Sequence, residues 1–258
     1  MKKAIATIAI AGAATAASAD FLSDLSIAGT FDYESQYVFR SAKLAYESFQ
    51  PSVDFGYSVL GGDAYFGIWT NQPITGLSHA GNGFANEIDF YLGYAYPVTD
   101  IFTVDAGFTY YWYPETIAGS GLPGQTREIF LGGSADVLLS PALYVYYDFD
   151  LEQVVVELSI GYSLDLGEYV GAEGLSFDTG AYLGFVDTED GSAGLTTPKV
   201  KNGYTYGGIT ADLVYALNEN VSSSIGVRWS VNNDGDSAGV NIGSESQVWF
   251  GATLGFAY

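Results

Sequence analysis

The strongest constraint on the fold is an alternation of apolar residues with small or polar ones, which recurs about a dozen times along the chain. The closing segment 248–258, VWFGATLGFAY, alternates Val, Phe, Ala, Leu, Phe and Tyr with Trp, Gly, Thr, Gly and Ala. Successive side chains of a β-strand point to opposite faces, so this spacing predicts strands with one continuous apolar face. The sequence therefore predicts an all-β protein.

The pattern predicts twelve strands in one domain that spans residues 20–258. An even number of strands joined alternately by short turns and long loops is typical of a bacterial outer-membrane barrel. The polar face consists of Gly, Ser, Thr, Tyr and carboxylates, which suits a wet interior better than a soluble surface. We therefore expect a single antiparallel transmembrane β-barrel whose apolar face contacts lipid. The expected strands are 25–39, 48–59, 63–71, 87–97, 101–113, 127–139, 142–150, 153–165, 174–185, 204–217, 221–231 and 246–258.

The connections between these strands differ in length. The short turns share one end of the barrel with both termini, and we expect that end to be periplasmic. The expected short turns are 61–62, 98–100, 140–141, 166–173 and 218–220. The expected long loops are 40–47, 72–86, 114–126, 186–203 and 232–245, with 151–152 as a short exception.

The first 19 residues have the pattern of a secretory signal peptide. A positive start, MKK, precedes the apolar stretch 4–17, and Ala-Ser-Ala at 17–19 fits a cleavage site. Without this segment, which contains two lysines, 239 residues remain with a net charge of −24. Such an acidic chain lacks the Lys and Arg that phosphate binding requires, so nucleic acid is excluded as a partner. The chain has no cysteine, which excludes a disulfide framework.

A resemblance lies in the segments FDYESQYVFRSAKL and SFQPSVDFGY, at 31–44 and 48–57. Together they resemble the TorF-type porin family, which opens with Ser-x-Tyr-x-Phe-Arg-Gly followed by a Pro and a second strand. The matching residues are Ser35, Tyr37, Phe39, Arg40 and Pro51. Ser41 stands where the family usually has Gly. The resemblance covers the first half of the chain, implies an outer-membrane porin-like barrel, and brings no catalytic residues. The terminal Tyr258 resembles the signal by which the outer-membrane assembly machinery recognises barrels.

Two sequence features suggest other chemistry. His79, the single histidine, raises the alternative of an outer-membrane lipid hydrolase, but Gly81 stands where such enzymes carry a Ser. A nucleophile needs its base within hydrogen-bond reach, so we expect no enzyme activity. The acidic stretches 187–190 and 234–236 lack the spacing of a calcium loop, so we expect neither a metal nor a cofactor.

The expected function is a narrow channel for small solutes or ions. Carboxylates on the inward face predict a preference for cations, because rings of Asp and Glu select cations in pores. Arg40, near the mouth, is expected to pair with a carboxylate across the lumen. The alternative is a non-conducting barrel whose loops bind a partner or surface. The residues expected to line the lumen are Arg40, Asp54, Asp89, Asp105, Asp136, Asp148, Glu157, Asp178, Asp212 and Arg228.

Overall fold

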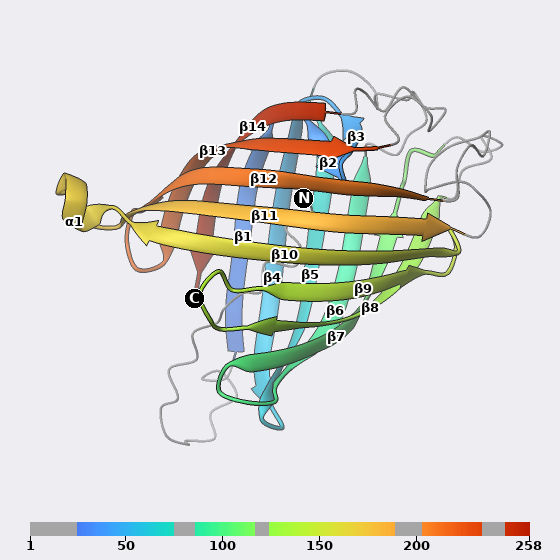
Figure 1. Cartoon of the computed structure of the whole chain (residues 1–258), viewed down its shortest axis with the longest axis horizontal. Coiled ribbons are helices and arrows are strands. Elements are labelled where there is room, and N and C mark those ends of the chain that lie inside the picture. Colours follow the sequence, from blue (N-terminus) through green and yellow to red (C-terminus); the bar gives the residue numbers. More distant parts are fainter. Residues whose placement is uncertain (1–24, 75–85, 117–123, 189–202, 234–245) are drawn as a thin grey trace.

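The computed structural model describes residues 25–74, 86–116, 124–188, 203–233 and 246–258. Twelve antiparallel strands form a closed barrel in this part of the chain (Figure 1). The barrel strands of the first half are β1 (Leu25–Glu34), β4 (Ser48–Val59), β5 (Gly62–Pro73), β6 (Glu87–Pro97), β7 (Phe102–Trp112) and β8 (Gln125–Ala135). Those of the second half are β9 (Ala142–Asp148), β10 (Gln153–Asp165), β11 (Leu175–Thr188), β12 (Gly203–Ala216), β13 (Val221–Asn232) and β14 (Ser246–Ala257).

The barrel closes where β1 pairs with β4 on one side and with β14 on the other. Leu25 lies opposite Tyr57, which precedes the short β4–β5 turn, and the backbone of Ile27 exchanges hydrogen bonds with that of Tyr258. The first and last described residues therefore lie at the end of the barrel that carries the short turns. The predicted fold, an antiparallel barrel of twelve strands, is confirmed.

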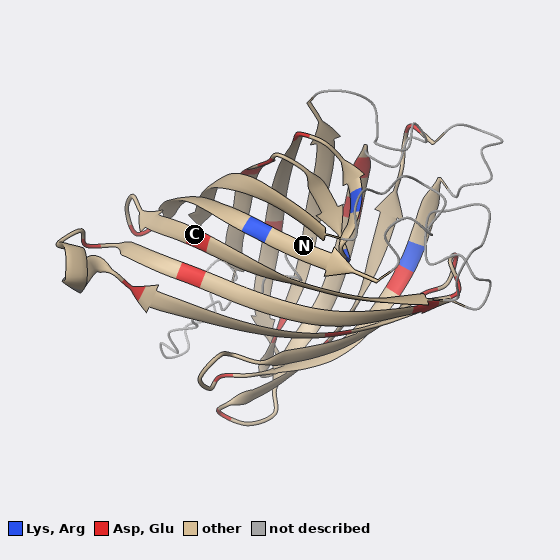
Figure 2. Cartoon of the chain, turned by 45° about the horizontal axis from the view of Figure 1, so that its top comes forward, with Lys and Arg blue, Asp and Glu red and all other residues tan. Residues whose placement is uncertain are grey.

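The two faces of each strand follow the predicted alternation. In β14, Val248 and Phe250 are 61% and 55% exposed on the outer face, whereas Trp249 between them is 5% exposed and faces inward. The same contrast recurs around the barrel, which leaves an apolar outer surface of large side chains. Figure 2 shows that acidic positions outnumber basic ones along the described strands and turns.

Three expected boundaries were wrong. The first strand ends at Glu34, and the chain then forms a separate hairpin of β2 (Tyr37–Phe39) and β3 (Ala42–Ala45), which we call the mouth hairpin. The alternation continues through the bend at 35–36, so periodicity could not reveal this break. The strand expected at 127–139 ends at Ala135, and the strand expected at 174–185 continues to Thr188. The turn expected at 166–173 is confirmed and contains the one-turn helix α1 (Gly167–Val170). Within the described residues, no helix is long and apolar enough to cross a bilayer.

Inward tyrosines lie against the barrel wall instead of pointing into the lumen. A Cβ atom added at Gly67 would lie 2.3 Å from Cζ of Tyr91, and one at Gly132 would lie 2.2 Å from Cδ1 of Tyr144. Each ring therefore covers a glycine on a neighbouring strand. Glycine is required at these positions because any side chain would displace the ring, and the arrangement leaves space along the barrel axis.

Candidate functional site

The mouth hairpin crosses the lumen at the end opposite the short turns. Tyr37 is 2% exposed, and its hydroxyl donates a hydrogen bond of 2.5 Å to Glu87 on β6. Burial, together with the neighbouring Glu87 carboxylate, raises the pKa of the Tyr37 phenol, so this donor stays protonated. The Tyr37 ring also packs against Trp69 on β5, with ring centroids 5.6 Å apart. These contacts fix one side of the hairpin to β5 and β6.

The tip of the hairpin is held by the opposite wall. The Ser41 carbonyl accepts hydrogen bonds from Asn232 on β13, at 2.8 Å, and from Gln247 on β14, at 3.3 Å. The Tyr204 hydroxyl on β12 donates to the carbonyl of Arg40 at 3.1 Å. The hairpin is therefore anchored to strands on both sides of the barrel, which narrows the mouth.

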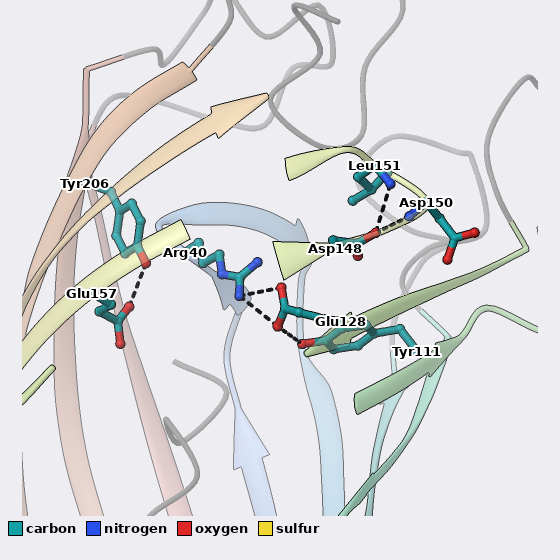
Figure 3. Close-up of polar contacts among 8 residues, drawn as sticks. All are labelled: Arg40, Tyr111, Glu128, Asp148, Asp150, Leu151, Glu157 and Tyr206. Carbon is teal, nitrogen blue, oxygen red and sulfur yellow. Dashed lines mark hydrogen bonds and ion pairs between the residues drawn. The ribbon is translucent and has the colours of Figure 1, made fainter. Parts of the chain in front are cut away.

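Arg40 at the tip forms an ion pair with the carboxylate of Glu128 on β8 (Figure 3). Its Nη2 atom lies 2.8 and 3.0 Å from the two carboxylate oxygens. The guanidinium carbon also lies 4.6 Å from the centroid of the Phe39 ring and 5.0 Å from that of Tyr146. Glu128 accepts a further hydrogen bond from the Tyr111 hydroxyl at 2.7 Å. The prediction that Arg40 pairs with a carboxylate across the lumen is thus met by this geometry.

The turn of the hairpin has an unusual backbone. Arg40 and Ser41 have φ angles of 48° and 58°, so both residues lie in the left-handed region that favours glycine. Two consecutive positive φ angles are characteristic of the tight two-residue turns whose twist matches paired strands. A turn of this type made of Arg and Ser stores strain, which the contacts at both carbonyls offset.

Three rows of inward residues repeat around the wall, each with a carboxylate, a glycine and a tyrosine directly opposite one another on three successive strands. We call them carboxylate–glycine–tyrosine rows. In each row the tyrosine ring lies beside the central glycine and its hydroxyl donates to the carboxylate, at 3.0 Å in the second row and 2.7 Å in the third. The rows are Asp54–Gly67–Tyr91 on β4–β6, Asp105–Gly132–Tyr144 on β7–β9 and Glu157–Gly184–Tyr206 on β10–β12.

A charged variant of this arrangement lies on β12, β13, β14 and β1. Arg228 on β13 lies 2.8 Å from Asp212 on β12 and 3.4 Å from Glu34 on β1. The carboxylates of Asp212 and Glu34 lie beside Gly226 and Gly251, where a Cβ atom would collide with them. Arg228 is therefore held against the wall between two carboxylates, and its positive charge is compensated there.

Below the mouth hairpin lies a cavity of about 480 Å³ that extends to the short turn at 218–220. Five carboxylates of the barrel wall line it. Arg40 on the hairpin is the one basic side chain among the described wall and hairpin residues that line the cavity. The carboxylates are Asp32, Asp54, Asp89, Glu128 and Glu157. The aromatic lining residues that the wall and hairpin contribute include Phe39, Trp69, Tyr91, Tyr111, Phe130, Tyr146 and Tyr182.

Three other expected lumen residues lie outside the lining of this cavity. Asp148, 2% exposed at the end of β9, accepts hydrogen bonds from the backbone of Asp150 and Leu151 and so caps the β9–β10 turn (Figure 3). Asp178 on β11 accepts hydrogen bonds from the hydroxyls of Ser163 and Ser176. Asp136 does not belong to the barrel wall: it is exposed beyond the end of β8, because the chain turns there before Pro141.

Two residues that hold the mouth hairpin, Glu87 and Glu128, are absent from the expected set. Both are 1% exposed and inward. The alternation of inward and outward positions could have revealed them, since Glu128 shares a face with Gly132 and Glu87 shares one with Asp89. The apolar Phe130 between Glu128 and Gly132 obscured the first of these patterns.

Several expectations concern residues outside the described ranges. They are the signal peptide at 1–19, His79, and most of the two acidic stretches, of which Asp187 at the end of β11 is described and exposed. Within the described part of the chain, no group of three or more His, Cys, Asp or Glu side chains could hold a metal ion.

Comparison with known proteins identifies a partial family match and a shared fold. Residues 16–131 match the model of a family described as a bacterial protein of unknown function, Gcw_chp. No curated protein matches. Among solved structures, the NanC porin superposes with a TM-score of 0.51 at 13% identity, covering 90% of this chain and 98% of that chain. LpxR from Salmonella typhimurium superposes with a TM-score of 0.50 at 9% identity, covering 90% and 99%. At such identities the likeness shows a common barrel fold.

Proposed function

We propose that the protein is an outer-membrane channel for small solutes or ions, with a preference for cations. The observation that carries this proposal is the acidic cavity inside a closed barrel whose outer surface is apolar. An apolar outer band with an inward polar face is what a bilayer-spanning barrel requires. The barrel reaches the membrane through the assembly machinery after the signal peptide is cleaved, and lipid covers the outer surface.

The charge of the cavity supports the cation preference. Its wall and hairpin contribute five carboxylates and one guanidinium, and that guanidinium is already paired with Glu128. Wall charges act over the screening length, about 8 Å at physiological salt, which reaches well into a cavity of about 480 Å³. Cations are therefore concentrated in the lumen and anions are depleted.

Recording from planar bilayers tests the proposal. The refolded chain without residues 1–19 is expected to produce discrete current steps, and in a potassium chloride gradient its reversal potential should have the sign of a cation-selective pore. Anion selectivity would contradict the proposed preference. A correctly folded barrel that never conducts would favour the alternative, a barrel that binds a partner through its loops.

The lipid-hydrolase alternative depends on His79. We expect His79→Ala to change neither folding nor conductance, because the sequence places no Ser two residues after it. A phospholipase or deacylase activity of the refolded protein that disappears in His79→Ala would replace the channel proposal with an enzymatic one.

A further inference from the structure

The cavity below the mouth hairpin has the composition of a binding site as well as that of a passage. Ligand sites are concave, mostly aromatic and apolar, and carry a few placed polar groups. Eight aromatic residues of the wall and hairpin and five carboxylates of the wall line this cavity. An inorganic cation would need the carboxylates alone, so the aromatic lining points to a ligand that also has a carbon skeleton.

The chain already holds one organic cation at the upper edge of this cavity. The Arg40 guanidinium lies 4.6 Å from the Phe39 ring centroid and 5.0 Å from that of Tyr146, and it is bonded to Glu128. A cation over an aromatic face is attracted by the ring, more strongly where water is excluded. The wall is therefore built to hold a planar cation between aromatic rings and a carboxylate.

A second carboxylate near Arg40 has no such cation. Glu157 faces the cavity from β10, on the other side of Arg40 from Glu128 (Figure 3). Its carboxylate accepts a hydrogen bond of 2.7 Å from Tyr206, and no basic side chain in the described residues forms an ion pair with it. Tyr146 and Tyr182 also line the cavity. Tyr146 interacts electrostatically with the carboxylate of Glu157.

We propose that the cavity binds small organic cations, compounds with an amine or guanidinium group on a short carbon chain, with Glu157 as the anionic partner and the adjacent tyrosine rings as the surface for the carbon chain. This inference rests on the proposed channel and names its substrate class. A neutral sugar could also stack on aromatic rings, but it would leave the charge of Glu157 uncompensated.

Current block tests this inference, with agmatine (1-amino-4-guanidinobutane) as the probe. Agmatine is expected to interrupt the potassium current in a voltage-dependent way, because a charged blocker enters the field of the lumen. Butylurea, which has a neutral urea in place of the guanidinium and lacks the terminal amine, and glucose are the neutral probes and should not block. Equal block by either neutral probe would overturn the inference.

The matched variants are Glu157→Gln and Asp63→Asn. Glutamine retains an acceptor for the Tyr206 hydroxyl, so the barrel should fold, but loss of the charge should raise the agmatine concentration for half block by about tenfold. Asp63 on β5 pairs with Ser58 and lies outside the cavity lining, so its variant should behave as the wild type. Unchanged block in Glu157→Gln would overturn the inference.

Calorimetric titration of the refolded barrel in detergent separates this inference from the channel function. If agmatine binds and Glu157→Gln weakens binding about tenfold, the cation site stands even where no current is recorded, and the channel proposal alone fails. If the barrel conducts cations but agmatine neither binds nor blocks, the channel proposal stands and the cation site is refuted.

Discussion

The guanidinium of Arg40 lies 2.8 Å from the carboxylate of Glu128, a residue 88 positions further along the chain. The two side chains are 10% and 1% exposed. This pair joins the tip of the mouth hairpin to the wall at β8 and places a fixed positive charge in the mouth. Both the width and the selectivity of the passage should therefore respond to its removal.

We expect Arg40→Ala to raise single-channel conductance and to strengthen the preference for cations. The substitution removes the one basic group of the hairpin that lines the cavity and leaves the Glu128 carboxylate uncompensated. The loss of one partner of a buried pair costs about 3 kcal/mol, so the urea midpoint of unfolding should fall as well. The double variant Arg40→Ala, Glu128→Gln should regain most of that stability.

Arg127→Ala is the matched control for this experiment. Arg127 pairs with Asp150 at 2.7 Å, but its side chain is 51% exposed on the outer face of β8. Water and salt screen an ion pair that is exposed to solvent, so the free energy of unfolding should change little. A selectivity shift of equal size in Arg127→Ala would show that Arg40 acts through total charge and not through its position in the mouth.

The carboxylate–glycine–tyrosine rows give a second prediction. A Cβ atom at Gly184 would lie 2.1 Å from Cζ of Tyr206, so Gly184→Ala must push the Tyr206 ring away from the wall and off Glu157. Overpacking of this kind costs about 1–3 kcal/mol, and the displaced ring should lower conductance. Urea unfolding and single-channel recording measure the two effects.

Gly161→Ala is the control for that variant. Gly161 is an inward glycine of β10, and the nearest atom to a Cβ added there is 3.8 Å away. We therefore expect near wild-type stability and conductance. If both alanine variants behave alike, the tyrosine rings do not depend on their glycines for position.

Most of the barrel was predictable because the period-2 alternation alone assigns each strand residue to the inner or the outer face. The closing segment 248–258 illustrates this, since its outer and inner faces follow from the letters alone. The mouth hairpin was not predictable in the same way. Tyr37 and Arg40 depend on Glu87 and Glu128, which lie 50 and 88 residues further along the chain, and nothing in the local pattern encodes those contacts.

The rows illustrate a second limit of the sequence. The alternation along each strand could assign the glycines and tyrosines to the inward face. Whether the tyrosine rings fill the lumen depends on the register in which the strands pair. Gly184 lies opposite both Glu157 and Tyr206 only because three strands pair in one particular register. That register sets the space in the lumen.

The backbone of the hairpin turn gives a third prediction, at Ser41. Ser41 has a φ angle of 58°, in the left-handed region that favours glycine. Ser41→Gly should therefore preserve folding and conductance, because glycine adopts positive φ readily and the carbonyl contacts to Asn232 and Gln247 remain. The Ser41 hydroxyl, which donates a hydrogen bond of 3.4 Å to the Gly207 carbonyl, would be lost.

Ser41→Val tests the same geometry from the opposite side. A β-branched residue at positive φ is strongly disfavoured, at a cost of about 1–3 kcal/mol. The valine variant should show a lower urea midpoint and noisier, higher conductance as the hairpin loosens. Equal behaviour of the glycine and valine variants would mean that the mouth hairpin does not hold this turn in solution.

The orientation of the barrel gives the last prediction. Glu115 follows β7 at the end that carries the mouth hairpin, whereas Glu219 lies in the β12–β13 turn at the end where the barrel's first and last described residues meet. Both side chains are exposed, and short turns face the periplasm in outer-membrane barrels. A membrane-impermeant maleimide should therefore label Glu115→Cys on intact cells and label Glu219→Cys only after the outer membrane is permeabilised. The chain has no cysteine of its own, so the unsubstituted protein serves as the control for background labelling. Labelling of Glu219→Cys but not Glu115→Cys on intact cells would reverse the topology and place the mouth hairpin on the periplasmic side.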